Sequence, residues 1–486
     1  MFYMIFSPVL IAAVFLLLFI SRKKHSNLLD RFIKISTVLF VSFSLMELFL
    51  PDLFMCTHEP DVLATMTGAK SHAILRWLNL VSFIVLPIAV FQKNKYFEKI
   101  ASFFCLPVAI VNVAFFYKYI EYFTAYSHSG LQTVRILSQG FRDSLTNETF
   151  RSIFFGLTCL FQLIALILLT YRNKEKLKIA KNEIVNLILI LIGVTYISLP
   201  IYAPQYLFGH INVMMIRFTP VHIGWILTIP AIIVALYFGF RNKSYEVRYL
   251  LVLALSWGLL MQFSQMYTAS GELNVMKLPL QLCNLGSYLA LIMLLKKSDN
   301  LFRFALIVNV VGAIIAIIVL DIGEDISHLT RLWVVHFMVE HTKVFIIPIL
   351  CLVLRIFKPL DIKSVKTFSL GFTVYYLFIF VLGTISNGFY RMCEGNPIQN
   401  FFYANHLFMF DKEIAKGLVG FTDPLFDNCV IKLGAFEIYP LVQGLVYLVF
   451  MAICVGVYML IYALTSKQRK SYAAENKNES LAPEQA

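Results

Sequence analysis

A cysteine and a histidine in the second half of the chain have side chains that could do chemistry together. Cys283 lies in the stretch KLPLQLCNLGS, and His341 follows in RLWVVHFMVEHTKVF. A thiol becomes a nucleophile when an imidazole within hydrogen-bond reach takes its proton. Both residues lie in apolar runs, where ionisable groups are costly and commonly face a cavity or the interior of a bundle. The two residues are therefore a candidate nucleophile and its base.

Each of these residues also has a structural interpretation. A lone cysteine in a membrane helix is usually a packing residue, and buried polar groups often join neighbouring helices by hydrogen bonds. The expected depth favours chemistry: at a rise of about 1.5 Å per residue, Cys283 lies roughly 9 Å and His341 roughly 15 Å below the outer boundary. Ordinary helix tilt can then bring the two side chains together.

Asn387 is the third predicted catalytic residue, because an amide at the same outer face could donate to an oxyanion. The Asn-Gly pair that it begins is also an ordinary helix stop. Seven further polar residues are expected to line the site and contact substrate: Gln281, Asn284, Ser287, His222, His336, Glu340 and Tyr390.

No cofactor and no metal site are expected, since the eight cysteines have no zinc-type spacing. The acidic loop DIGEDISH, residues 321–328, could bind a divalent cation or a cationic headgroup, or it could be a solvated loop.

The composition excludes a soluble globular protein. The chain of 486 residues is 59% hydrophobic, with a mean hydropathy of +0.76, whereas soluble domains are about half apolar. The fold class is therefore all-α: a polytopic membrane helical bundle of about 13 transmembrane helices. The expected spans are residues 3–21, 32–51, 73–91, 100–120, 150–171, 184–206, 219–240, 249–268, 278–295, 303–320, 331–354, 367–388 and 437–463.

The net charge of +13 is interpreted as a topology signal, not as a nucleic-acid surface. The cations lie in short segments between apolar runs, and most of them fall on the odd-numbered connections and in the tail. Because cytoplasmic loops carry the excess of Lys and Arg, we expect a cell-membrane protein with its N-terminus outside and its C-terminus in the cytoplasm. The polar tail is expected to be disordered.

The chain also has the pattern of a duplication. WLNLVSFIVL, residues 77–86, is similar to QLCNLGSYLA after a shift of 205 residues, and a second, weaker pair is 191–202 with 380–390. Parallel repeats follow if the copies have the same orientation. We predict a degenerate N-terminal repeat at 1–210, a repeat with the candidate site at 211–465, and a tail at 466–486. Leu78 stands in the first repeat where Cys283 stands in the second.

The longest connection, between about 389 and 435, has aromatic, half-apolar stretches typical of interfacial helices that cover a site. Cys393 and Cys429 lie in it and could pair in an oxidising environment.

From about residue 218 to 463, the chain resembles the YwaF-type family of bacterial integral membrane proteins. The resemblance lies in LPLQLC, which ends at Cys283, in the VEH of His341, in Asn387 with Tyr390, and in His222 of TPVHIG. Gln281 replaces the histidine usual before the cysteine, which removes a second proton relay. A eukaryotic branch of this family is similar to membrane acyltransferases that remodel ether phospholipids with a cysteine and a histidine. The resemblance thus implies Cys/His-dependent acyl transfer or hydrolysis on membrane lipids.

Two other classes stay open. A transporter or permease would use Cys283 and His341 as substrate ligands, since multi-pass repeats with buried polar groups are common in transporters. A noncatalytic scaffold would leave the polar residues far apart. The sequence leaves the lipid, the oligomeric state and the role of the first repeat open.

Overall fold

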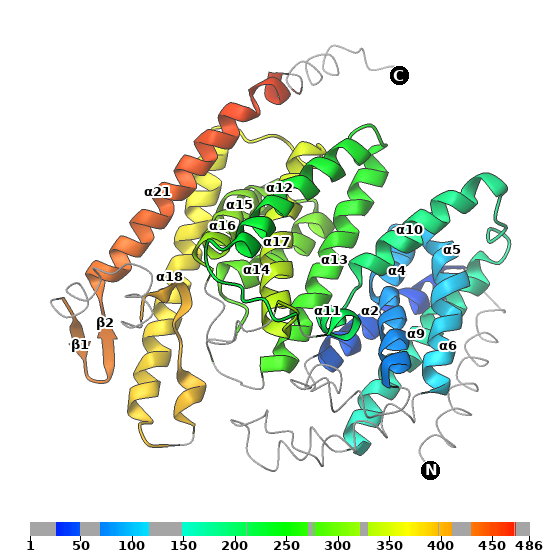
Figure 1. The fold of residues 1–486 in the computed structure, drawn as a ribbon, viewed down its shortest axis with the longest axis horizontal. Helices are drawn as coiled ribbons and strands as arrows, with labels where there is room; N and C mark the ends of the chain where they lie inside the picture. The colour runs from blue at the N-terminus through cyan, green and yellow to red at the C-terminus, as the bar shows by residue number, and fades with distance from the viewer. Residues whose placement is uncertain are drawn as a thin grey trace. The chain divides into compact units, whose positions relative to one another are not determined.

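The computed structural model describes residues 26–48, 69–115, 148–209, 211–270, 275, 278–320, 329–396, 398–410, 429–470 and 472. These residues are mostly helical, as Figure 1 shows, and their strands form one two-stranded sheet. The all-α prediction is confirmed. The first predicted span, the acidic loop at 321–328 and most of the tail lie outside the described residues.

The chain divides into two compact units. Unit 1 comprises Met1–Asn212, Leu260–Gly271 and His328–His336, and unit 2 comprises Val213–Leu259, Glu272–Ser327 and Phe337–Ala486. Two long helices therefore contribute one end to unit 1 and the rest to unit 2. Each unit is described by itself below.

Unit 1 is built from apolar helices that follow one another along the chain. Its elements are α2 (Ser26–Leu48), α4 (Ala69–Phe91), α5 (Lys95–Ile100), the π-helix η1 (Ala101–Cys105), α6 (Leu106–Ala114), α9 (Glu148–Asn173), the 3-10 turn η2 (Lys181–Glu183), α10 (Ile184–Ile197) and α11 (Ala203–Phe208).

Unit 2 has a similar order of helices, followed by a hairpin and one more helix. Its elements are α12 (Pro220–Phe240), α13 (Tyr245–Ser270), α14 (Leu282–Lys296), α15 (Asp299–Phe304), the π-helix η4 (Ala305–Asn309), α16 (Val310–Val319), α17 (Leu332–Val353), α18 (Lys363–Met392), the 3-10 turns η5 (Gln399–Phe402) and η6 (His406–Phe408), β1 (Ile431–Leu433), β2 (Phe436–Ile438) and α21 (Pro440–Leu464). The ends of α13 and α17 that belong to unit 1 are the exceptions.

Nine of the helical segments in the described residues are long and apolar enough to cross a membrane. They include the two segments that run through π-helices, Lys95–Ala114 and Asp299–Val319. Many of their large apolar side chains are exposed, for example Leu227 on α12 and Leu448 on α21. Exposed apolar surface of this extent fits contact with lipid.

Two predicted spans differ from the helices observed. The span predicted at 184–206 is broken between α10 and α11, because Pro200 disfavours helical backbone at Leu199. In unit 1, Gln262 Nε2 donates to the Leu199 carbonyl at 2.5 Å, and the Ile201 N–H donates to Gln265 Oε1 at 3.0 Å. These glutamines satisfy the backbone groups freed by the break, as a low-dielectric setting requires.

The second difference concerns the segment that carries the cysteine. The predicted span starts at residue 278, but the helix α14 starts four residues later, at Leu282. Pro279 disfavours helical backbone at the residue before it. Leu278–Gln281 forms a turn instead. Cys283 therefore lies in the first turn of α14.

Two stretches of the units match in layout. The π-helices η1 and η4 begin at Ala101 and Ala305, and each is preceded by a lysine with left-handed backbone, Lys93 with φ 51° and Lys297 with φ 48°. Both pairs are separated by 204 residues (305 − 101 and 297 − 93). The shift at these turns is thus one residue less than the 205 expected from the preceding sequence match.

Candidate functional site

The turn before Cys283 is held by side chains from two other elements of unit 2. The Tyr375 hydroxyl on α18 donates to the Leu280 carbonyl at 2.6 Å. Asn309, the last residue of the π-helix η4, donates through Nδ2 to the Leu282 carbonyl at 2.5 Å. Because a π-helix re-aims the side chains around it, this element positions Asn309 toward the turn.

Close packing fixes the first turn of α14 as well. An added Cβ on Gly286 would lie 2.8 Å from Val344 on α17 and 3.1 Å from Asn309 Nδ2. On the neighbouring helix, an added Cβ on Gly312 would lie 3.0 Å from the Leu282 Cβ. Glycine is needed at position 286 because α14 approaches α17 too closely for any side chain.

The Cys283 thiol lies among polar groups. Its Sγ donates to Asn284 Oδ1 at 3.3 Å, and the backbone N–H of Asn284 also interacts with the sulfur. Glu340 on α17 and the Tyr375 hydroxyl lie within electrostatic range of it. Gln281 is the N-cap residue of α14, yet its side chain makes no capping bond to this helix. The first-turn N–H groups of α14 have no partner within the helix, as at any helix N-terminus.

Glu340 and His341 are adjacent on α17, and both are almost fully buried. Ser287 on α14 donates to Glu340 Oε1 at 3.4 Å. His341 Nδ1 lies 2.7 Å from the Phe337 carbonyl, and the two rings are tilted by 36° with centroids 4.1 Å apart. A carbonyl can only accept, so Nδ1 carries the proton and Nε2 carries the lone pair of the neutral ring. That tautomer suits a base.

His222, predicted to contact substrate, makes bonds typical of a structural residue. It is fully buried, its Nδ1 accepts from the Phe218 N–H at 2.9 Å, and its Nε2 donates to the Ile317 carbonyl at 2.7 Å. Both ring nitrogens are thus used to tie the start of α12 to the end of α16. The structure gives His222 no role at the thiol.

Asn387, predicted as an oxyanion donor, uses its amide to hold a loop. Its Nδ2 donates to the carbonyls of Gly383 at 2.9 Å and Ala404 at 2.6 Å, and its Oδ1 accepts from the Ala404 N–H at 3.4 Å. Both amide hydrogens have carbonyl partners. Tyr390 packs on the same loop, with its ring 5.8 Å from that of Tyr403.

That loop, residues 398–410, reaches back to the cysteine turn. The Leu407 N–H donates to Gln281 Oε1 at 3.3 Å, so Gln281 binds the loop through its side chain. At the loop's end, an added Cβ on Gly383 would lie 2.2 Å from the ring of Phe410. The close approach seats this aromatic ring directly on α18.

His406, in the same loop, is a residue that the sequence analysis did not single out. It is fully buried, and neither ring nitrogen has a hydrogen-bond partner among the described residues. Its burial lowers the pKa of His406 to about 4, and the backbone of Leu278 is the nearby group that opposes this shift. In the sequence it is a histidine in an aromatic stretch. This pattern alone does not indicate that the loop, and His406 with it, lies close to the cysteine turn.

The remaining predicted residue on α17, His336, precedes Glu340 by about one helical turn. His336 belongs to the part of α17 assigned to unit 1, where its ring lies 6.1 Å from Phe263 and 6.5 Å from Trp333. Cys393 and Cys429 both carry free thiols. In the described residues no cluster of His, Cys, Asp or Glu could hold a metal ion.

Residues 217–455 match the model of the TMEM164 family. The matched part of this integral membrane protein contains Cys283, His341 and Asn387, together with the loop that covers the cysteine turn. No curated protein and no solved structure matches the chain. The YwaF-type resemblance and the duplication stay predictions.

Proposed function

We propose that the TMEM164-like region is a lipid acyltransferase or lipid hydrolase in which Cys283 is the nucleophile and His341 the base. The observation that carries the proposal is the setting of the thiol. It lies in the first turn of α14, beside backbone N–H groups and within electrostatic range of Glu340 on α17, the residue next to His341. A helix N-terminus favours negative charge near it.

The proposed reaction begins with an acyl ester of a membrane lipid. The proton of the Cys283 thiol passes to His341 Nε2 as the sulfur bonds to the ester carbonyl carbon. The carbon–oxygen ester bond then breaks, and the leaving lysolipid oxygen takes the proton from His341. A hydroxyl of a second lipid attacks the thioester, gives its proton to His341 and receives the acyl group, while the sulfur regains a proton. Water in place of that hydroxyl gives hydrolysis.

Two features refine the earlier expectation. Since Asn387 already donates to two carbonyls, the first-turn N–H groups of α14 are better candidates to hold the oxyanion. An ionised Glu340 would oppose a stored thiolate, because like charges in a buried site repel strongly. In the proposal the proton therefore leaves Cys283 only as the sulfur attacks.

An apolar groove between α18 and α21 supports a lipid substrate. It has a volume of about 460 Å³ and is lined mainly by Leu377, Phe380, Pro440 and aromatic rings. Tyr376 lines it, and the preceding residue, Tyr375, lies beside the thiol.

We also infer that unit 1 is a second copy of the scaffold without the chemistry. The matched π-helices and left-handed lysines support a duplication. In unit 1, Asn79 and Gln162 form a reciprocal amide pair, with distances of 2.8 and 3.3 Å. The proposal keeps the predicted orientation in a cell membrane, with the Cys283 end of unit 2 outside.

The test is acyl exchange between a labelled phospholipid and a lysophospholipid by the purified chain in nanodiscs. Cys283→Ala should abolish the exchange, whereas Cys105→Ala, which removes a buried thiol in unit 1, should keep it. Full exchange by Cys283→Ala would refute the proposal. Transport of the lipid without any change in its acyl chains would favour the permease alternative.

A further inference from the structure

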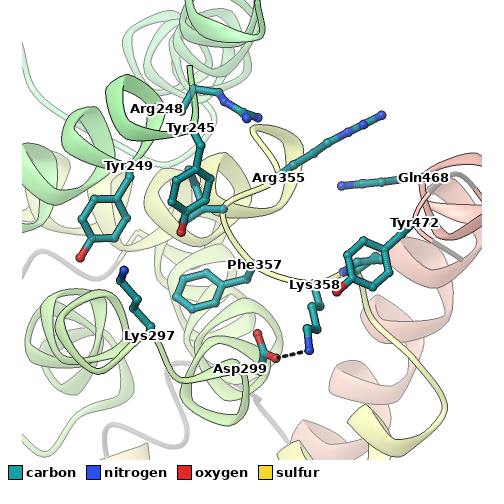
Figure 2. Close-up of a pocket in the computed structure, with 12 residues that line it drawn as sticks. Tyr245, Arg248, Tyr249, Lys297, Asp299, Arg355, Phe357, Lys358, Gln468 and Tyr472 are labelled. Atoms are coloured by element: carbon teal, nitrogen blue, oxygen red, sulfur yellow. Dashed lines mark ion pairs between the residues drawn. The ribbon is translucent and has the colours of Figure 1, made fainter. Parts of the chain in front are cut away.

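A second cavity lies at the opposite end of unit 2 from Cys283. It has a volume of about 580 Å³ and is lined by residues from the start of α13, the α14–α15 turn, the segment after α17 and the chain after α21 (Figure 2). Lys297, at the far end of α14 from Cys283, is one of them. The 14 residues between these positions span roughly 20 Å of helix, so the cavity is separate from the proposed active site.

The lining is strongly basic. Arg248, Lys297, Arg355 and Lys358 contribute four cations, and Asp299 is the only carboxylate among the lining residues. Lys358 Nζ lies 3.9 Å from Asp299 Oδ2, as the dashed line in Figure 2 marks. Lys297, Arg355 and Lys358 are exposed, and cations grouped around one cavity give it a positive potential that attracts anions. The charge therefore points to an anionic ligand.

Two of the cations, Lys297 and Arg355, have left-handed backbone, a conformation that favours glycine. Lys297 has φ 48° and Arg355 has φ 56°. Each ends a helix with the paired backbone bonds of a left-handed cap: Ser298 N–H to the Met293 carbonyl at 3.0 Å, and Ile356 N–H to the Cys351 carbonyl at 2.8 Å. Left-handed backbone costs a residue other than glycine roughly 1 kcal/mol or more. A cation at both places indicates that the side chains have a use.

Hydrogen-bond donors complete the lining. Arg248 donates to the Leu354 carbonyl, and its buried Nε has no hydrogen-bond partner among the described residues. Tyr245 and Tyr249 stack with centroids 6.1 Å apart, and the Lys297 ammonium lies 5.6 Å from the Tyr249 ring. Figure 2 shows Tyr472 on the other side of the cavity. Arginine forks and tyrosine hydroxyls are suited to phosphate oxygens.

We propose that this cavity binds the phosphate groups of a phosphorylated anionic ligand, such as the headgroup of a phosphoinositide lipid. Its volume is in the range of small-molecule sites. The lining residues come from the basic connections that the charge pattern assigns to the cytoplasm, where anionic headgroups attract clustered cations. The ligand is therefore expected at the leaflet opposite the one in which Cys283 acts.

The test is a binding titration of the full chain in phosphatidylcholine nanodiscs. Inositol hexakisphosphate is the soluble probe, and nanodiscs that contain phosphatidylinositol bisphosphate are the lipid probe. The test variant is Lys297→Gly with Arg355→Gly, since glycine suits both left-handed positions and so keeps the fold. The matched control is Lys243→Gln with Lys363→Gln, which removes two exposed cations that do not line the cavity.

The expected result is a loss of roughly 100-fold in affinity for the test variant, about tenfold for each charge-assisted hydrogen bond lost. Its melting temperature should stay unchanged or rise, and the control should bind nearly as the wild type does. Cys283→Ala should bind fully. Binding of the lipid probe alone identifies the membrane as the source, and binding of both probes identifies the headgroup. Absence of binding by either probe, or an equal loss in the control, would overturn the proposal.

Discussion

Units 1 and 2 share a helical layout, and they differ in how the charged side chains at one turn are paired. In unit 1, the charged side chains near Lys93, the lysine with left-handed backbone, form ion pairs. Lys93 lies 3.5 Å from Asp30, and Arg172 lies 2.7 Å from Asp30 and 2.9 Å from Glu98. The corresponding turn of unit 2, at Lys297, borders a cavity with four cations and one carboxylate in its lining.

The same end of unit 1 contains a second saturated group. Lys99, almost fully buried, lies 2.5 Å from Glu183, and Lys95 lies 2.8 Å from it. Hydrogen bonds from the two lysines lower the pKa of Glu183 to about 2. The charged side chains here in unit 1 are thus paired within the unit, whereas the corresponding turn of unit 2 borders the proposed anion site.

The polar side chains at Asn79 in unit 1 and at the first turn of α14 in unit 2 also differ in how they are paired. In unit 1 an Asn79–Gln162 amide pair satisfies its own donors and acceptors. In unit 2 the first turn of α14 presents a thiol within electrostatic range of the Glu340 carboxylate. Polar side chains at this end of unit 1 pair with one another, whereas in unit 2 our proposal assigns them to chemistry.

The largest expected effect is on the rate of acyl transfer. His341→Ala should lower the rate by roughly 10²–10⁴-fold, the usual contribution of a general base. Gln162→Ala, which breaks the amide pair of unit 1, should leave the rate within about twofold of wild type, since unit 1 takes no part in the chemistry. Initial rates in nanodiscs measure both. Similar losses in the two variants would remove the distinction between the units.

The next effect is on stability. Gly286→Leu forces a side chain into contact with Val344 and Asn309, and overpacking of this kind costs about 1–3 kcal/mol. Gly193→Leu on α10 in unit 1 meets nothing within 4 Å and should change stability by less than about 0.5 kcal/mol. Thermal unfolding in detergent compares them. An equal fall in melting temperature would mean that α14 is not packed as described.

A smaller effect concerns the loop over the cysteine turn. In the open loop His406 should regain a pKa near 6.5, whereas burial holds it at about 4 when the loop is closed. The closed loop is therefore fully stabilised above about pH 6.5 and loses stability as the pH falls toward 4. At pH 5.5 the open fraction should rise about tenfold.

Hydrogen exchange of residues 398–410 between pH 7 and 5, corrected for the intrinsic pH dependence of exchange, measures this opening. The variant His406→Gln lacks the titrating ring and should show no such rise. An identical rise in that variant would assign the opening to another group.

The smallest effect is on the thiol itself. Glu340→Gln removes a negative charge near Cys283 while keeping an acceptor for Ser287. The reaction of Cys283 with a thiol-directed probe should become a few-fold faster, because a carboxylate opposes charge on the sulfur. Glu340→Asp is the control that keeps the charge. A slower reaction in Glu340→Gln would show that the carboxylate assists the thiol instead.

The sequence was sufficient for most of the helices in the described residues, whereas the role of Cys283 stays a prediction. Long apolar runs mark the spans because each helix must satisfy its own backbone in lipid, and LPLQLC places the thiol where a proline ends one turn and a helix begins. The break at Pro200 also had a visible signal, the Leu199–Pro200 pair.

The partners of the polar residues could not be predicted from the sequence. Asn387 has a side chain that could donate to an oxyanion. Its amide instead donates to the carbonyl of Ala404, in the loop that follows α18. His222 looks like a substrate ligand until both ring nitrogens are seen to bind backbone groups. His406 is of interest because it is buried in a loop. Arg355 is of interest because its backbone is left-handed at the end of a helix. Such contacts depend on tertiary packing, which residue type and spacing do not encode locally.

The central claim is that the chemistry of this chain resides on a single thiol in unit 2. The most direct measurement is mass spectrometry of the protein after incubation with a donor phospholipid and without an acceptor. The account predicts one acyl group on the peptide that contains Cys283, removed by hydroxylamine as a thioester is, and absent in His341→Ala. An acyl group on another cysteine, or none under conditions where acyl exchange proceeds, would contradict it.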